Sequence, residues 1–225
     1  MVYTFWEGPM PEYIKLCMET WKFDYKVLDY NTLHDYTDLQ VHKLMRFTLP
    51  QIADVVRVHV LRDQGGVWLD TDTIMIGDEL PEENMIGSSE ERTNTIGYLR
   101  TEKGSDMYKE WADWQDTMLE EAKTPARWDV MGNAFTDYYV MKHPEITIAD
   151  VSKCWAEVYM VKSPMSRVLK YQRFYFEQQK SLKDLLPTNM LMLHNSWTPG
   201  WYKQMSREEI LKHGCTLSNI LREVL

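Results

Sequence analysis

The chain has 225 residues, of which 25 are basic (Lys and Arg) and 34 are acidic (Asp and Glu), so its formal net charge at pH 7 is −9. Hydrophobic residues make up 44% of it and charged residues 26%, which is typical of a globular domain and excludes a disordered or fibrous chain. The acidic balance argues against nucleic acid as a partner and against a polybasic grip on anionic lipid, because both need clustered Lys and Arg.

The cysteine pattern and the lack of long apolar runs indicate the compartment. Cys17, Cys154 and Cys215 are odd in number, far apart and without CxxC spacing, which favours free or buried thiols over a disulfide framework or a thiolate zinc site. No stretch approaches the roughly 18 apolar residues of a membrane span, and the N-terminus lacks signal-peptide features. We expect a cytoplasmic protein with no integral membrane segment, a prediction that still allows peripheral membrane association.

The first hundred residues alternate between predicted strands and helices. Strands are predicted at 2–5, 25–30, 67–69, 73–76, 85–87 and 94–99. One helix is predicted after Pro11, and another over about 51–63, opened by Pro50 and ended by Gly65-Gly66, because glycine accepts the left-handed conformation that follows a helix. Residues 31–50 predict short helices or loops. This alternation is typical of α/β proteins.

Aromatic and apolar residues dominate the later part of the chain. Met107, Trp111, Trp114 and Met118 recur at helical spacing and predict a helix with one apolar stripe. The other predictions are a helix at 134–142, strands at 146–151, 157–161 and 190–193, and a closing helix from about 206. The polar and aromatic stretch 163–187 has no predicted element. Because no repeat or linker is visible, we expect a single domain.

The most informative segment covers residues 54–72. Asp54 and Arg57 lie three apart on a predicted helix, so they share a face. A glycine turn and a strand then lead to Asp70-Thr71-Asp72. In a regular strand Asp70 and Asp72 would point to the same side, where two like charges are costly without a counterion. A divalent cation with oxygen ligands relieves this repulsion; solvated turn carboxylates are the alternative.

This segment resembles the core motif of nucleotide-sugar-dependent glycosyltransferases, most closely glycosyltransferase family 32, which includes capsular-polysaccharide and mannosyl transferases. The glucosylating clostridial toxins have a related pattern. Further segments that resemble the family are Tyr3-Thr-Phe-Trp6-Glu7-Gly8, Thr20-Trp21-Lys22 and His194-Asn195-Ser196-Trp197. The matches span about 2–197 in the family's order, although 100–185 matches only loosely. The sequence departs from the family at the missing Ile-Pro-Lys before the first strand, at the tighter spacing of the closing His and Ser-Trp, and at Gly132-Asn133, where relatives often have Gly-Pro.

The resemblance implies a fold and an activity. The fold is GT-A, a Rossmann-like α/β/α sandwich with a mixed central sheet, in one domain over 1–225. Residues of about 1–100 would bind the nucleotide sugar, and about 100–225 would supply the acceptor side and the closing segment. The activity is transfer of a sugar, with retention, from a nucleotide-sugar donor (we expect a UDP-sugar) to a glycan acceptor in surface or capsular polysaccharide synthesis. The implied cofactor is Mn²⁺ or Mg²⁺.

The resemblance also assigns roles near the start of the chain. Phe5, Trp6 and Glu7 follow the carboxyl end of the first strand, where nucleotides bind in such folds, and Trp6 would stack on or flank the base unless it packs in the core. Asp54 and Arg57 would contact the nucleotide and the donor sugar. The alternative for that pair is an intrahelical ion pair.

The remaining roles centre on the Asp-x-Asp motif and the end of the chain. Asp70, with Thr71 beside it, would contact ribose, sugar or metal, and Asp72 would be the direct metal ligand to the diphosphate. His194 is the best further ligand, because imidazole suits manganese better than magnesium, although a lone His at a strand end is often structural. The residues expected to act in catalysis are Asp70, Asp72 and Arg57.

Three polar residues would complete the donor site. Ser196 and Trp197 would hydrogen-bond the leaving phosphate, and Asn94, after Glu90-Glu91, would reach the sugar. The residues identify no nucleophile, so the hypothesis is same-face transfer in which the departing phosphate deprotonates the acceptor.

Two other functions compete with this one. Phosphatases of the haloacid dehalogenase type also use Asp-x-Asp after an apolar strand, and Asp70-Thr-Asp72-Thr73 is superficially similar. Those enzymes usually place the motif on the first strand and need a later Lys and an acidic pair. The second alternative is a nucleotide-sugar- or carbohydrate-binding module without catalytic activity.

Overall fold

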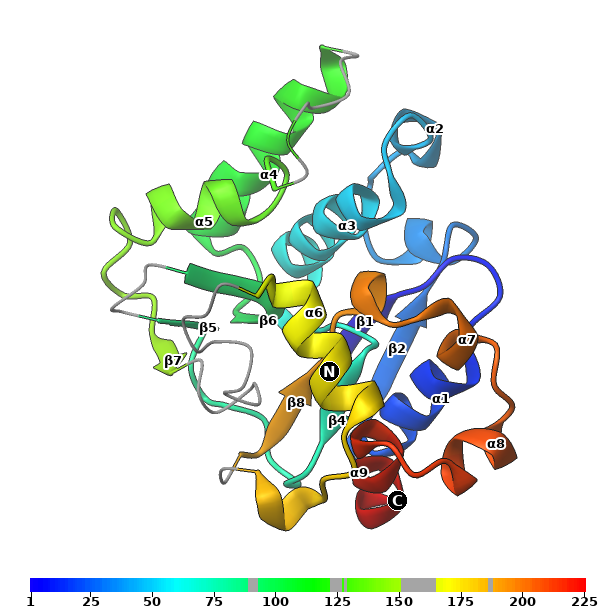
Figure 1. Cartoon of the computed structure of the whole chain (residues 1–225). Coiled ribbons are helices and arrows are strands. Elements are labelled where there is room, and N and C mark those ends of the chain that lie inside the picture. The colour runs from blue at the N-terminus through cyan, green and yellow to red at the C-terminus, as the bar shows by residue number, and fades with distance from the viewer. Residues whose placement is uncertain (89–92, 122–126, 128, 151–164, 186–187) are drawn as a thin grey trace. The chain divides into compact units, whose positions relative to one another are not determined.

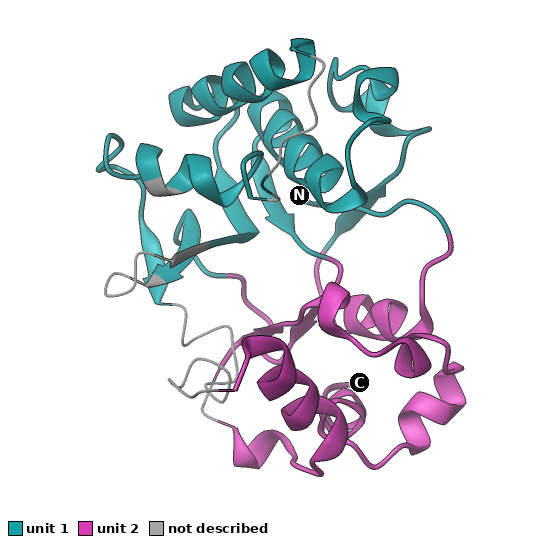
Figure 2. Cartoon of the chain, turned by 45° about the horizontal axis from the view of Figure 1, so that its top comes forward, with its two compact units in different colours: residues 1–8, 24–70, 81–151 teal, residues 9–23, 71–80, 152–225 magenta. Residues whose placement is uncertain are grey.

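The computed structural model describes residues 1–88, 93–121, 127, 129–150, 165–185 and 188–225. Its internal contacts divide the chain into two compact units (Figure 2). Unit 1 comprises Met1–Gly8, Asp24–Asp70 and Pro81–Val151, and unit 2 comprises Pro9–Phe23, Thr71–Leu80 and Ser152–Leu225. The units interleave along the chain, whereas the predicted division falls near residue 100. The single domain over 1–225 and that division both stay predictions.

Unit 1 is built on a six-stranded sheet with the order β2-β1-β3-β6-β5-β7 (Figure 1). The strands are β1 (Val2–Phe5), β2 (Tyr25–Leu28), β3 (Gly66–Leu69), β5 (Met85–Ser88), β6 (Thr93–Thr101) and β7 (Ile148–Asp150). Strand β1 pairs in parallel with β2 and β3, whereas β6 is antiparallel to β3 and β5. The sheet is therefore mixed, and the expected α/β class with a mixed central sheet is confirmed.

Helix α3 (Leu49–Gln64) is the central helix of unit 1, and it packs against β1, β3, β6 and α4 (Figure 1). A capping box between Thr48 and Gln51 starts it, so it begins two residues before the predicted boundary. Ten of its residues, from Gln51 to Leu61 without Ala53, are buried. The helix ends at Gly65, whose φ of 67° lies in the left-handed region, as expected from the sequence.

Helix α4 (Asp106–Glu120) differs from its predicted apolar stripe at one position. Met107 and Trp111 are buried, but Trp114 is 43% exposed and Gln115 takes the buried position instead. The reason is the four-residue spacing from Trp111 to Gln115, which continues the buried face, while Trp114 lies at its edge. The Gln115 Nε2 donates to the backbone oxygens of Met131, at 2.6 Å, and Asp54, at 3.1 Å.

The other helices of unit 1 have the predicted type, but their bounds differ from the predicted ones. They are the short helices η1 (Leu33–Asp35) and α2 (Val41–Leu44), in the stretch expected to hold short helices or loops, and α5 (Asn133–Tyr139). Helix α5 is shorter than the predicted 134–142. The predicted strand at 157–161 lies outside the described residues.

Unit 2 consists of one antiparallel strand pair and several short helices. Strand β4 (Thr73–Met75) pairs with β8 (Met190–Met192), with Thr73 opposite Met192. The helices are α1 (Glu12–Glu19), α6 (Arg167–Gln172) with its π-helical continuation η4 (Arg173–Glu177), η5 (Leu182–Asp184), η6 (Asn195–Trp197), α7 (Gly200–Lys203), α8 (Arg207–Lys212) and α9 (Thr216–Val224). Helix α1 packs against β4, α7 and α8.

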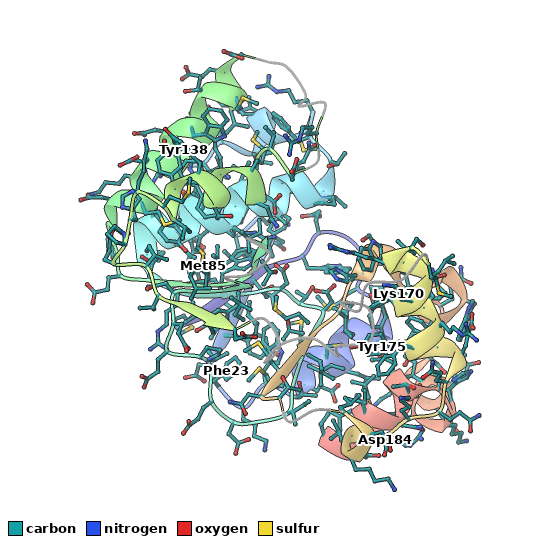
Figure 3. The ribbon with its side chains drawn as sticks, turned by 60° about the vertical axis from the view of Figure 1, so that its left-hand side comes forward. Phe23, Met85, Tyr138, Lys170, Tyr175 and Asp184 are labelled. Carbon is teal, nitrogen blue, oxygen red and sulfur yellow. The ribbon has the colours of Figure 1, made fainter. Side chains whose placement is uncertain are left out.

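In unit 2 one helical prediction was wrong, and one helix was not predicted. The expected single closing helix from about 206 is divided into α8 and α9, because His213 adopts an extended conformation and Gly214 separates the helices. Residues 167–177, for which no element was predicted, form one continuous helix from α6 into η4; Figure 3 labels Lys170 and Tyr175 on it. Its π-helical part departs from the 3.6-residue period, so the usual apolar spacing is lost.

No helix within the described ranges combines the length and apolar character that a membrane crossing needs. Cys17 and Cys215 are buried free thiols, as expected, and Cys154 lies outside the described residues.

The turn after α3 generates a stability prediction. A Cβ at Gly65 would lie 2.5 Å from the backbone nitrogen of Lys103, whereas a Cβ at Gly104, whose φ is 77°, meets nothing within 4 Å. We expect Gly104→Ala to cost about 1–2 kcal/mol, from the left-handed backbone alone. Gly65→Ala should cost roughly 3 kcal/mol or more, because the backbone must also move. Urea denaturation of both variants measures their free energies of unfolding. Equal losses of stability in the two variants would contradict the prediction.

Candidate functional site

The two carboxylates of the Asp-x-Asp motif belong to different units. Asp70 ends the second segment of unit 1, and Asp72 lies at the start of the second segment of unit 2. Strand β3 ends at Leu69 and β4 begins at Thr73, so the motif forms a turn. The motif therefore lies between the two strands, where the sequence placed it, and the orientation of its two carboxylates to one side stays a prediction. The two intervening peptide bonds nevertheless keep the two Cα atoms within about 7–8 Å of each other.

In unit 1 the guanidinium group of Arg57 is the centre of the site. Its Nη2 lies 3.0 Å from Asp54 Oδ1 and 3.3 Å from Asp70 Oδ1, and the side chain is only 5% exposed. Its Nε donates to the backbone oxygen of Ala53 at 3.2 Å, and its Nη1 donates to the backbone oxygen of Ile96. Every nitrogen of the guanidinium is thus engaged, and Arg57 joins two residues of the predicted site.

Trp68 sets the orientation of Asp70. Its indole Nε1 donates to Asp70 Oδ1 at 2.8 Å, and the Asp70 backbone nitrogen donates to the Gly97 oxygen at 2.8 Å. The guanidinium carbon of Arg57 lies 5.3 Å from the centroid of the Trp68 ring. The Asp70 side chain remains 32% exposed, so it is oriented but accessible. The sequence signal for this contact was the Trp-x-Asp spacing: Asp70 directly follows β3, and a two-residue separation along an extended chain places its side chain on the side of Trp68.

Asp54 is held in a buried, tightly fitted position. Burial is the largest cause that raises its pKa, to about 7; the negative charges of Asp70 and Asp129 add to the increase, and Arg57 opposes it. A Cβ at Gly132 would lie 2.8 Å from Asp54 Oδ2, so only glycine allows this approach. Asp54 and Arg57 do form the intrahelical ion pair that was the alternative interpretation, while their contact with a donor stays a prediction.

The residues at the end of β1 lie in unit 1 as well. Phe5 is buried against Tyr30, with ring centroids 5.6 Å apart, and Glu7 Oε2 accepts a hydrogen bond from the Tyr30 nitrogen at 3.1 Å. Trp6 is half-buried, and its indole Nε1 has no hydrogen-bond partner among the described residues. Because the Nε1 atom itself is buried, this N–H is an unsatisfied donor inside the protein, and the role of Trp6 at the base stays a prediction.

In unit 2, strand pairing connects Asp72 to the closing segment, defined here as residues 193–198. The Leu193 nitrogen donates to the Asp72 backbone oxygen at 2.9 Å, and the Asn195 nitrogen donates to Asp72 Oδ2 at 2.7 Å. His194 lies between these two donors in the chain. The structure therefore places Asp72 against the backbone on either side of His194, although the two residues are distant in the sequence; their joint binding of a metal stays a prediction.

Two tyrosines that the sequence analysis missed hold the closing segment. The Tyr171 hydroxyl accepts from the His194 nitrogen at 3.2 Å and lies 3.3 Å from Thr198 Oγ1. The Tyr13 hydroxyl donates to Asn195 Oδ1. Neither tyrosine belongs to a recognisable motif. Each one contacts a residue that is distant along the chain, and such a contact leaves no local pattern in the sequence.

His194 is largely buried and packs against Trp197, while Ser196 beside it is exposed. Burial lowers the pKa of His194 to about 4, and the charge of Arg167 adds to the decrease. The imidazole is therefore neutral near pH 7, the form in which histidine binds metals. Its ring centroid lies 3.9 Å from that of Trp197, and Ser196 is exposed.

Metal binding and the role of Asn94 stay predictions. Within the described ranges, no three His, Cys, Asp or Glu side chains form a group that could hold a metal ion. Asp72 and His194 give one carboxylate and one neutral imidazole, a pair of donors that Mn²⁺ accepts when phosphate and water complete its shell. Asn94 pairs with Gly87 in the sheet, and its side chain lies outside the described residues.

Comparisons with known proteins agree with the resemblance seen in the sequence. Residues 2–195 match the model of a family described as "Capsular polysaccharide synthesis protein". No curated protein matches the chain. Among solved structures, the chain is similar to one titled "PaToxG Glycosyltransferase", with 14% sequence identity and a TM-score of 0.44, over 64% of this chain and 68% of that one.

The buried carboxyl group of Asp54 predicts a pH dependence of stability. Its folded-state pKa of about 7 lies above the value of about 3.9 in an unfolded chain, so the fold binds a proton more tightly. That stabilisation is fully present below about pH 4 and is lost as the pH rises through about 7. Asp54→Asn cannot ionise, so between pH 4 and 8 the stability of the wild type should fall relative to that of the variant.

Urea unfolding at several pH values measures this difference. Val55→Ala, an uncharged substitution in the same buried helix, should shift the free energy of unfolding equally at every pH. If the free energies of unfolding of the wild type and Asp54→Asn differ by the same amount from pH 4 to 8, the raised pKa of Asp54 is contradicted.

Proposed function

Because this chain belongs to the capsular polysaccharide synthesis protein family, we propose that it is a glycosyltransferase. The donor is a nucleotide sugar, taken here as a UDP-sugar, and the acceptor is a hydroxyl group of a glycan in surface polysaccharide synthesis. The transfer depends on Mn²⁺ or Mg²⁺ and retains the configuration of the sugar.

The observation that supports this proposal best is that each aspartate of the Asp-x-Asp turn is held by contacts with other predicted site residues or their neighbours. Asp70 is oriented by Arg57 and Trp68, and Asp72 accepts the Asn195 N–H of the closing segment at 2.7 Å. Two of the segments that resemble the transferase family, residues 54–72 and the closing segment, are therefore joined by a direct contact within unit 2. Solvated turn carboxylates would not need such contacts.

The residues of unit 1 supply recognition of the nucleoside and the sugar. Half-buried Trp6, at the end of β1, would flank the base, and the exposed part of Asp70 is available to ribose or sugar hydroxyls. Arg57 acts as a positioning residue, because its nitrogens already bind Asp54, Asp70 and the backbone.

The residues of unit 2 serve the diphosphate. Asp72 and His194 would hold the divalent metal, which supplies Lewis-acid stabilisation of the negative charge on the leaving group. Exposed Ser196 and half-buried Trp197 are available to donate hydrogen bonds to phosphate oxygens. Tyr13 and Tyr171 keep the closing segment in place for this task.

The chemical step exchanges two carbon–oxygen bonds. The bond from the anomeric carbon to the diphosphate breaks, and its electron pair stays on the phosphate oxygen. The acceptor oxygen forms a bond to the same carbon from the same face, and its proton passes to the departing phosphate. A glycosyl adduct trapped on any Asp or Glu would show a double displacement instead.

A binding module without activity is the remaining alternative, since the family match gives the phosphatase hypothesis no support. Hydrolysis of a UDP-sugar in the presence of Mn²⁺ separates the two. A module binds the donor without turnover, whereas a transferase releases UDP slowly to water in the absence of an acceptor.

Substitution of Asp72 tests the proposed role of the motif. Asp72→Asn keeps an oxygen that can accept the Asn195 N–H but removes the charge, so metal-dependent donor hydrolysis should fall roughly 100-fold or more. The melting temperature should change little. Steady-state release of UDP at saturating Mn²⁺ measures the effect.

The control for this substitution lies in the same segment of unit 2. Asp78 is exposed and pairs with Lys22 at 2.7 Å, so Asp78→Asn should leave hydrolysis unchanged. Equal rates for wild type and Asp72→Asn would argue against a role for the motif in transfer.

A further inference from the structure

The two units differ in net charge, and only unit 1 has a negative one. Unit 1 has 23 acidic and 12 basic residues, a formal net charge of −11, whereas unit 2 has 11 acidic and 13 basic residues, a net charge of +2. The unit that holds Asp72 and His194 is thus the one whose charge suits an anionic ligand.

One basic residue next to the closing segment is Arg167, the first residue of α6. Tyr171, whose hydroxyl binds the His194 nitrogen, follows four residues later, so the two share a face of the helix. The same helix reaches the closing segment a second time, because the Gln172 Nε2 donates to the Trp197 backbone oxygen at 2.9 Å. Arg167 is exposed, and no carboxylate among the described residues lies within ion-pair distance of it.

A second basic residue is Lys203, the last residue of α7. The ring of Tyr202, the preceding residue, packs 5.9 Å from that of Tyr13, which binds Asn195. Lys203 is half-buried, and its backbone nitrogen donates to the oxygen of Pro199, the residue that follows the closing segment, at 3.2 Å. Within the part of the chain that the structure describes, its ammonium group has no ion-pair partner.

Other basic residues of unit 2 contrast with these two. Lys22 pairs with Asp78, and Lys212 pairs with Glu208, so their charges are compensated within the protein. A half-buried ammonium group without such a partner is stabilised when a ligand supplies the counter-charge.

We propose that Arg167 and Lys203 bind the diphosphate of the nucleotide-sugar donor and stabilise the nucleoside diphosphate as it leaves. This inference rests on the proposed function and adds to it two residues outside the motifs that resemble the transferase family. Both lie beside the closing segment, one through α6 and the other through α7. They share the charge of the diphosphate with the metal, so the site does not depend on the metal alone for its electrostatics.

The experiment measures the affinity of UDP, UMP and uridine in the presence of Mn²⁺ by competition with a fluorescent nucleotide. Arg167→Met and Lys203→Met should each weaken UDP binding about 10-fold, which is the effect of one charge-assisted hydrogen bond, and the double variant should weaken it further. Uridine affinity should stay at the wild-type value. In donor hydrolysis, kcat should fall more than KM rises, because the leaving-group charge is largest in the transition state.

The controls are Lys212→Met and Arg207→Met, which remove exposed and paired charges of the same unit and should leave all three affinities unchanged. UDP affinity that is unaffected in both test variants overturns the inference, as does an equal loss of uridine affinity, which indicates a structural role. If the wild type itself binds no nucleoside diphosphate with any metal, the proposed function fails and the inference fails with it.

Discussion

The pairing of residues 72–77 with residues 189–195 is the constraint on which the organisation of unit 2 depends. It includes the β4–β8 ladder, the bonds from Ile76 and Gly77 nitrogens to the Asn189 oxygen, and the two bonds at Asp72. Because strand register is specified residue by residue, this ladder alone decides that Asp72 meets the closing segment. A shift of one residue would place Asp72 opposite a different neighbour and would remove the Asn195 contact.

In unit 1 the equivalent constraint is the buried Arg57. A guanidinium removed from water is tolerated only when its hydrogen bonds are satisfied, and here two carboxylates and two backbone oxygens satisfy it. Loss of one partner from such a buried group costs about 3–5 kcal/mol. Burial destabilises the ionised form of Asp54, and its pKa is therefore raised to about 7. The orientation of Asp70 and the stability of the fold are thus connected through one side chain.

The distribution of charge between the two units limits what the net charge of the whole chain implies about its ligands. A net charge of −9 excludes a broad electrostatic grip on nucleic acid, and that conclusion applies to the acidic surface of unit 1. It does not apply to unit 2, where Arg167 and Lys203 belong to helices that contact or adjoin the closing segment. An average over the whole chain conceals this difference, because residues of both units alternate along the sequence.

The sequence by itself determined the local elements and the positions of the candidate residues. Strand β1, the glycine end of α3 and the turn at residues 70–72 follow from patterns within a few residues, because backbone conformation responds to near neighbours. It also placed Asp54 and Arg57 on one helix face, and they do form an ion pair.

Only the tertiary structure decided which of those residues meet. The contacts of Asp72 with Asn195, of Tyr13 with Asn195 and of Tyr171 with His194 join segments that are distant along the chain. The division of the chain into units of opposite net charge, and the π-helical turn after α6, were equally invisible to local patterns. The physical reason is that such contacts depend on strand register and helix packing, which are properties of the folded chain as a whole and leave no short-range signal in the sequence.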